Sequence, residues 1–118
     1  MITASLVSAV CLAVVFLLLG VGKISATAPM RERAAHVGMS VSTYRGIGAL
    51  EVAGAAGLLI GGLVPAVGAA AGIGLLLLMG GAVATHVVNG DGLRAMMPAL
   101  LVGVVTLAYL VVLIGSIR

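Results

Sequence analysis

Long apolar runs separated by short interruptions are the dominant pattern along this chain of 118 residues. A polar stretch at 23–43, a Gly/Pro break near 61–65 and an Asn-Gly-Asp-Gly sequence at 89–92 divide the runs. A helix needs roughly 20 apolar residues to cross the hydrocarbon core of a bilayer. The pattern therefore predicts four transmembrane helices, at about 2–22, 44–63, 65–88 and 95–117.

The apolar residues follow one another instead of alternating, which distinguishes helix from strand. Residues 10–19 and 75–78, for example, are apolar at every position. A strand of a transmembrane barrel alternates between a lipid side and a polar lumen side. Inside lipid, every backbone N–H and C=O needs an internal partner, and helices provide it. The chain is thus predicted to be all-α, an integral membrane four-helix transmembrane bundle forming a single domain over residues 1–118.

Capping residues and prolines sharpen the predicted helix ends. Ser42 or Thr43 is expected to cap the second transmembrane helix, because either side chain can accept from a free N–H of the first turn. Pro65 fits the first position of the third helix, where a missing N–H costs nothing. Pro98 is expected in the first turn of the fourth helix for the same reason.

The first apolar segment also resembles a signal peptide, since Ala26-Thr27-Ala28 fits the A-x-A cleavage pattern. Residues 1–5, however, contain no Lys or Arg, and Pro29 would follow the cut directly. We therefore expect this segment to be retained as a first span. In the polar connection that follows, residues 30–37 are expected to form a short helix at the membrane interface.

The composition agrees with lipid as the solvent of this chain. Hydrophobic residues make up 63% and charged residues 8%, which is too little polar surface to cover a water-soluble globule. The net charge of +3 comes from six basic residues at loop ends, without interleaved aromatics. Nucleic acid is therefore not an expected partner.

The basic residues indicate topology instead, because cytoplasmic loops retain Lys and Arg. The first predicted connection is the richest in basic residues, the third holds Arg94, and the second holds none. In an inner (plasma) membrane this places the first and third connections on the cytoplasmic side and both termini on the outer side. The residues expected to contact lipid headgroups are Arg31, Arg33, Arg45 and Arg94.

Small residues recur at a four-residue spacing on the second and third predicted transmembrane helices. Such rows let helix backbones approach closely, so that dispersion and Cα–H contacts replace the hydrophobic drive that lipid does not supply. We expect them to form packing seams within the chain, and a dimer interface is the alternative. The residues are Ala49, Ala53, Gly57, Gly61, Gly68 and Gly72.

Glu51 most requires an explanation, because it lies about two turns inside the second predicted span. Insertion scales give a cost of roughly 2.5 to 3.5 kcal/mol for an acid at the centre of a span. Its helical neighbours Gly48, Gly54 and Ala55 are small, so another helix can pack over the carboxylate and shield it from lipid. A polar partner should offset the remaining cost.

Two candidate partners are expected at the membrane depth of Glu51. Lys23 ends the first predicted span, and His86 lies near the end of the third. Thr85 and Asn89, one turn apart, are expected to add neutral hydrogen bonds. These five residues form a predicted ligand or proton site. A buried ion pair that only sets the order of the helices is an alternative of equal weight.

No catalytic set can be assembled from the other polar residues. Cys11 is a lone thiol in an apolar segment, so neither a disulfide nor a redox pair is predicted. His86 lacks a second histidine at ligand spacing, and no metal is expected. Thr106 and Tyr109 are interpreted as a hydrogen bond at a helix seam, with a cavity wall as the alternative. The residues interpreted as solvated turn residues are Asp91 and Arg94.

Three segments, taken in order, resemble DoxX-like membrane proteins. They are Phe16-Leu-Leu-Leu-Gly-Val-Gly-Lys23, Gly46-Ile-Gly-Ala-Leu-Glu51-Val-Ala-Gly54 and Gly81-Ala-Val-Ala-Thr-His86. The resemblance implies a four-helix fold and, for some members, association with membrane redox systems such as a thiosulfate:quinone oxidoreductase. By this resemblance, the polar residues of the family correspond to Lys23, Glu51 and His86 of this chain.

These observations lead to one hypothesis of function and two alternatives. The leading hypothesis is a non-catalytic accessory or binding subunit of a membrane-associated redox complex, with a cytoplasmic-side polar pocket for quinone or lipid. Its expected partners are the bilayer and other membrane protein subunits or further copies of the chain. The alternatives are a proton-coupled small-molecule transporter of the four-span dimeric type and a purely structural membrane subunit. No cofactor is evident apart from a possible quinone; the residues leave open whether the chain catalyses a reaction, and a non-catalytic role is the favoured interpretation.

Overall fold

The computed structural model describes residues 2–116, which form five α-helices and no strand. The helices are α1 (Ile2–Ser25), α2 (Ala28–His36), α3 (Val41–Ile60), α4 (Pro65–Val88) and α5 (Leu93–Ser116). By length and composition, α1, α4 and α5 can each cross a membrane. The prediction of an all-α membrane protein is confirmed. The predicted count of four spans is not, because α3 carries Arg45 and Glu51 and is less apolar than the other long helices.

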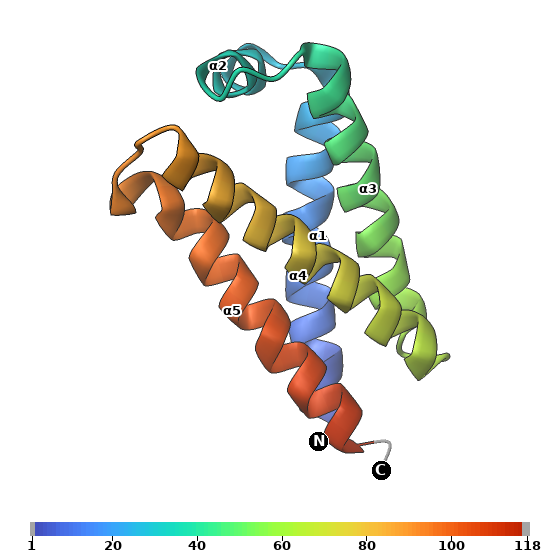
Figure 1. Cartoon of the computed structure of the whole chain (residues 1–118). Coiled ribbons are helices and arrows are strands. Elements are labelled where there is room, and N and C mark those ends of the chain that lie inside the picture. Colours follow the sequence, from blue (N-terminus) through green and yellow to red (C-terminus); the bar gives the residue numbers. More distant parts are fainter. Residues whose placement is uncertain (1, 117–118) are drawn as a thin grey trace.

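The four long helices run alternately up and down, and the short α2 lies across one end of them (Figure 1). Helix α1 packs on α3, α3 on α4, α4 on α5, and α5 on α1, which closes a ring of four helices. The start of α1 and the end of α5 lie at the end of the bundle opposite α2 (Figure 1). At the α2 end, α4 and α5 diverge from α1 and α3 (Figure 1).

Apolar side chains fill the middle of this ring. Phe16, Leu58, Leu75 and Leu113 come from the four long helices and are all buried. Many other large apolar side chains face outward, and Leu77 is 72% exposed. An apolar exterior of this extent suits acyl chains as the surrounding solvent, since soluble monomers rarely expose large contiguous apolar patches.

Left-handed backbone conformations end three of the helices at the α2 end of the bundle. Ala26 (φ 52°), Gly38 (φ 73°) and Gly90 (φ 71°) follow α1, α2 and α4 respectively. After each of them, the next N–H donates to a carbonyl five residues back, as in a Schellman turn. The last of these turns brings Asp91 back beside His86, because the Asp91 N–H donates to the His86 carbonyl.

The predicted ends of two helices differ from the observed ones. Ser40 is the cap of α3, since its side-chain oxygen accepts from the Thr43 N–H at 3.1 Å, so the expectation of Ser42 or Thr43 is wrong. Helix α5 begins at Leu93, and Pro98 therefore lies inside the helix and not in its first turn. The predicted last residue of this helix, 117, lies outside the described residues.

The row of small residues on α3 divides between two surroundings. Ala49 and Ala53 are exposed, so the prediction that they pack within the chain is wrong. Gly57 and Gly61 are buried against α4. A Cβ atom at Gly61 would lie only 2.6 Å from the Cα of Gly68. Further along α4, Gly72 packs against α5.

The seam between α1 and α3 uses glycines outside the predicted rows. A Cβ at Gly20 would lie 2.6 Å from the Gly48 carbonyl oxygen, and a Cβ at Gly48 would lie 2.7 Å from the Gly20 carbonyl oxygen. The two backbones are therefore in direct contact. Lys23 follows Gly20 by one turn, so this contact places its side chain against α3.

Candidate functional site

An ion pair joins α1 to α3 near the α2 end of the bundle. Lys23 Nζ lies 2.7 Å from Glu51 Oε1. The Glu51 side chain is fully buried, and the Lys23 side chain is 11% exposed. As the small neighbours of Glu51 predict, another helix covers the carboxylate: the Cβ of Lys23 itself packs against Gly48.

Tyr44 is a second residue of α3 in contact with the lysine. The Lys23 ammonium lies 5.3 Å from the centroid of the Tyr44 ring, within cation–π range. Tyr44 and Glu51 are two helical turns apart and share one face of α3. Lys23 is thus held between a carboxylate and an aromatic face, and no sequence pattern marks Tyr44 as part of the site.

The second carboxylate oxygen of Glu51 has no partner within residues 2–116. Both oxygens are inaccessible to solvent, and neither accepts a hydrogen bond other than the interaction of Oε1 with Lys23. A buried polar atom left without a partner costs about 1–3 kcal/mol, and such atoms are rare in native proteins. Oε2 therefore retains unused capacity to bind a hydrogen-bond donor.

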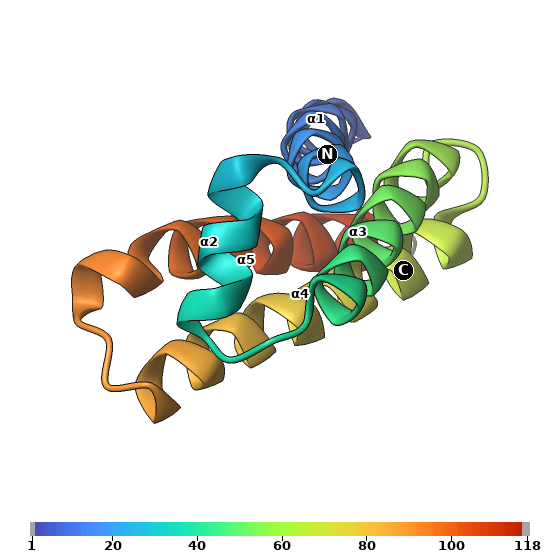
Figure 2. The ribbon, with the colours of Figure 1, turned by 90° about the horizontal axis from the view of Figure 1, so that it is seen from above.

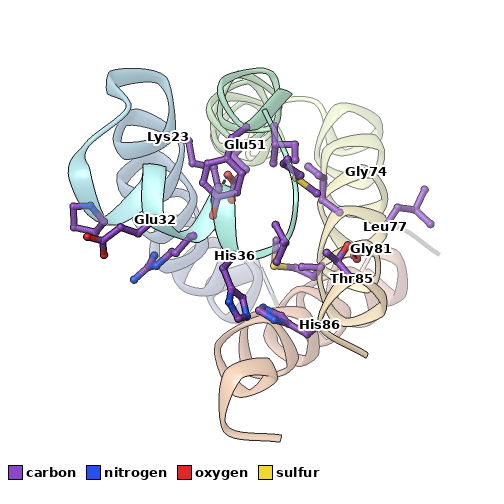
Figure 3. Close-up of a pocket in the computed structure, with 18 residues that line it drawn as sticks. Lys23, Glu32, His36, Glu51, Gly74, Leu77, Gly81, Thr85 and His86 are labelled. Atoms are coloured by element: carbon purple, nitrogen blue, oxygen red, sulfur yellow. Dashed lines mark hydrogen bonds and ion pairs between the residues drawn. The ribbon is translucent and has the colours of Figure 1, made fainter. Parts of the chain in front are cut away.

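A pocket of about 950 Å³ lies beside the ion pair, bounded by α1, α2, α3 and α4. Figure 3 shows Lys23 and Glu51 on one side of it and Gly81 and Thr85 on another. Its walls differ in character: α1, α2 and the start of α3 contribute most of the charged and polar groups, whereas α4 contributes a mostly apolar stripe at helical spacing. That stripe consists of Gly74, Leu77, Leu78, Gly81, Ala82, Thr85 and His86, and Met79 of the same helix also lines the pocket. Such a combination suits an amphiphilic ligand.

A second polar cluster joins α2 to the turn between α4 and α5. Asp91 Oδ2 lies 2.7 Å from His86 Nδ1, and Asp91 Oδ1 lies 2.7 Å from His36 Nε2. The hydrogen bonds from His86 and His36 hold the pKa of the Asp91 carboxyl below its usual range. Because the carboxylate is the acceptor, these bonds assign the ring hydrogen of His86 to Nδ1 and that of His36 to Nε2.

Comparison with models of known protein families matches residues 7–113 to the DoxX-like family. The chain belongs to the DoxX-like family. The resemblance seen in the sequence is therefore confirmed, and the matched range includes Lys23, Glu51 and His86. Comparisons with curated proteins and with solved structures gave no match.

The structure of this DoxX-like protein brings together some of the predicted site residues and separates others. Lys23 meets Glu51, whereas His86 lines the same pocket but binds Asp91. Thr85 also lines the pocket, and its hydroxyl donates to the Gly81 carbonyl of its own helix at 2.8 Å.

Asn89 and Asp91 are placed differently from their predictions. The Asn89 amide is exposed and donates a hydrogen bond to the Thr85 carbonyl of its own helix at 2.8 Å. Asn89 does not line the pocket. The Asp91 side chain is only 11% exposed and bridges two histidines, so its interpretation as a solvated turn residue is wrong. A local signal existed, because Gly90 after α4 predicts a turn that folds Asp91 back onto the helix.

The predicted headgroup arginines and Thr106 differ from one another in their surroundings in this DoxX-like protein. Arg45 and Arg94 are exposed, Arg33 lines the pocket, and Arg31 Nε donates to the Ala26 carbonyl at 2.9 Å. The buried Thr106 hydroxyl donates to a carbonyl within α5, so it does not make the predicted hydrogen bond across a seam. Within residues 2–116, no three His, Cys, Asp or Glu side chains form a group that could hold a metal ion.

Proposed function

We propose that this DoxX-like protein is a non-catalytic accessory or binding subunit of a membrane-associated redox complex, and that its pocket holds a quinone or a lipid. The observation that carries the proposal is the buried carboxylate of Glu51. Lys23 neutralises one oxygen, and the other has no partner at the wall of a pocket of about 950 Å³. Because Oε2 is covered, a ligand would satisfy it only after the side chains over it move to admit a hydrogen-bond donor.

The proposal includes α3 as a fourth membrane span. Its 20 residues give a length of about 30 Å, which equals the thickness of the hydrocarbon core. Arg45 lies near the start of α3 and is exposed, so it can reach headgroups, while Glu51 is covered by the protein and does not face lipid. With the basic α2 end on the cytoplasmic side, both termini would lie on the outer side.

Proton-coupled transport is the alternative function, since a buried acid beside a pocket is also what a proton-driven carrier needs. Two features favour binding over transport. The pocket lies at the α2 end of the bundle, and the core beyond it is filled by Phe16, Leu58 and Leu75, none more than 1% exposed. Proton-driven uptake into liposomes that is lost in Glu51→Gln would reverse this ranking.

Purification in a mild detergent, followed by mass spectrometry of co-purifying small molecules and proteins, tests the proposal. We expect a quinone or lipid at close to one molecule per chain in the unmodified protein, and its loss in Glu51→Gln, which removes the charge while keeping the shape. Arg45→Gln is the matched control, because Arg45 is an exposed charge on the same helix that does not line the pocket.

The result that contradicts the proposal is a folded, monodisperse protein that carries no small molecule and no partner. Equal ligand content in the unmodified protein, Glu51→Gln and Arg45→Gln would also contradict it, because Glu51 would then play no part in binding. A stable, ligand-free chain that still assembles with a partner would favour the purely structural subunit.

A further inference from the structure

Helix α2 covers one end of the pocket but packs only against the α1 and α3 side of the bundle. Seen from above, it extends from the ends of these helices over the side on which α4 and α5 lie (Figure 2). Glu32, Arg33 and His36 are the α2 residues that carry charged or titratable groups into the pocket lining. In the part of the chain that the structure describes, the side-chain hydrogen bond from α2 to the opposite side joins His36 Nε2 to Asp91 Oδ1, at 2.7 Å.

Asp91 is held in place by more interactions than His36. Asp91 is anchored, because the turn after α4 folds it back, His86 binds its other oxygen at 2.7 Å, and its side chain is only 11% exposed. His36 is 60% exposed and lies at the last residue of α2. The contact can therefore break on the α2 side without disturbing α4.

The α4 wall of the pocket is apolar and exposed. Leu77 is 72% exposed, and a Cβ atom at Gly74 or at Gly81 would have no neighbouring atom within 4 Å. All three residues line the pocket and lie on an apolar helix long enough to cross the membrane. With α4 as a membrane span, this side of the pocket would face acyl chains and the α2 side would face the headgroups and water.

We propose that Asp91 is a latch that holds α2 across the water-facing mouth of the pocket, so that a ligand reaches the pocket from the bilayer. This inference rests on the proposed function, and it names the regulation of the same site and the source of its ligand. The ligand is accordingly an amphiphile dissolved in the membrane, not a water-soluble metabolite. Releasing His36 from Asp91 opens the pocket to water.

The access of water to a cysteine in the pocket tests the latch. The full chain, with Cys11→Ser to remove the exposed native thiol, receives Gly81→Cys, which fits because Gly81 has open space. In lipid nanodiscs this thiol is treated with a charged, water-soluble thiol reagent. We expect slow labelling with the latch intact and labelling several-fold faster after Asp91→Ala or His36→Ala.

Three controls separate the latch from general loosening of the fold. His86→Ala should accelerate labelling less than His36→Ala, because the bond from His36 to Asp91 remains. Arg94→Gln, an exposed charge near Asp91, should leave the rate unchanged. A cysteine at the exposed Ala95, outside the pocket, should react at one rate in all of these backgrounds.

Equal labelling of Gly81→Cys with and without Asp91 would overturn the latch, and so would equal labelling with and without His36. His36→Ala keeps the inference testable if Asp91→Ala does not fold, because a side chain that is 60% exposed contributes little packing. The labelling is done without added ligand and so does not depend on Glu51 binding anything. Failure of the latch and failure of the proposed function are therefore distinguishable.

Discussion

Replacing Lys23 with methionine is expected to lower the free energy of unfolding by about 3 kcal/mol, as is typical when one partner of a buried ion pair is removed. Methionine keeps an unbranched apolar side chain against Gly48 but removes the charge. The fully buried Glu51 carboxylate would then have no partner for either oxygen. Reversible unfolding in mixed micelles of a denaturing and a mild detergent measures the change.

Two further variants show whether the loss comes from the pair itself. Adding Glu51→Met to Lys23→Met should restore most of the stability, because no buried charge is then left unpaired. Arg45→Met removes an exposed charge from the same end of the bundle and should change the free energy of unfolding by less than about 0.5 kcal/mol. An effect of Lys23→Met no larger than that of Arg45→Met would mean that the ion pair does not stabilise the fold.

Gly48→Leu should have an effect at least as large, because it separates the two helices that carry the pair. A Cβ atom at this position would lie 2.7 Å from the Gly20 carbonyl oxygen and 2.7 Å from the Lys23 Cβ. The first of these neighbours is backbone and cannot rotate away, so α1 has to move. We expect a loss of about 3 kcal/mol or more, at the upper end of the cost of overpacking, measured by the same unfolding assay.

Gly46→Leu is the matched control for this prediction. Gly46 precedes Gly48 by two residues on the same helix, and a Cβ there would meet no atom within 4 Å. Leucine is a better helix former than glycine by about 0.8–1 kcal/mol, so this variant should be neutral or slightly more stable than the unmodified protein. Similar losses for Gly46→Leu and Gly48→Leu would contradict the close contact between α1 and α3.

The contact between Lys23 and Glu51 could be predicted from the sequence because both residues break long apolar runs. A charge in such a run has few acceptable places, and a lysine at the end of one span and an acid near the start of the next lie at similar depth. The small residues beside Glu51 also indicated that another helix could cover its carboxylate. A short helix was also predicted in the polar connection, at residues 30–37, and the structure has α2 (Ala28–His36) there.

The packing partners of α3 could not be predicted in the same way. A row of small residues identifies a face of a helix but not the helix that covers it. Helix α3 in fact uses two faces, with Gly48 and Glu51 toward α1 and Gly57 and Gly61 toward α4. Ala49, one residue from Gly48, consequently remains exposed.

The contact between His36 and Asp91 could not be predicted from the sequence either, because it depends on where α2 lies over the bundle. The two residues are 55 positions apart, and no periodicity relates a short polar helix to a distant turn. The sequence places His86 at the membrane depth of Glu51, which predicts that the two are neighbours. Depth alone, however, does not determine which way the His86 side chain points around the axis of α4. The nearer carboxylate of Asp91, five residues along the chain, binds it instead.

Solid-state NMR in lipid bilayers tests most directly that Glu51 is a buried carboxylate paired with Lys23. The chain contains one lysine and two glutamates, so isotope labels at the lysine Nζ and the glutamate Cδ, combined with Glu32→Gln, report on this pair alone. We predict strong dipolar coupling between the two labels, as the 2.7 Å contact between Nζ and Oε1 requires. No coupling to Lys23, together with close contacts between the Glu51 carboxyl carbon and lipid acyl protons, would contradict the account.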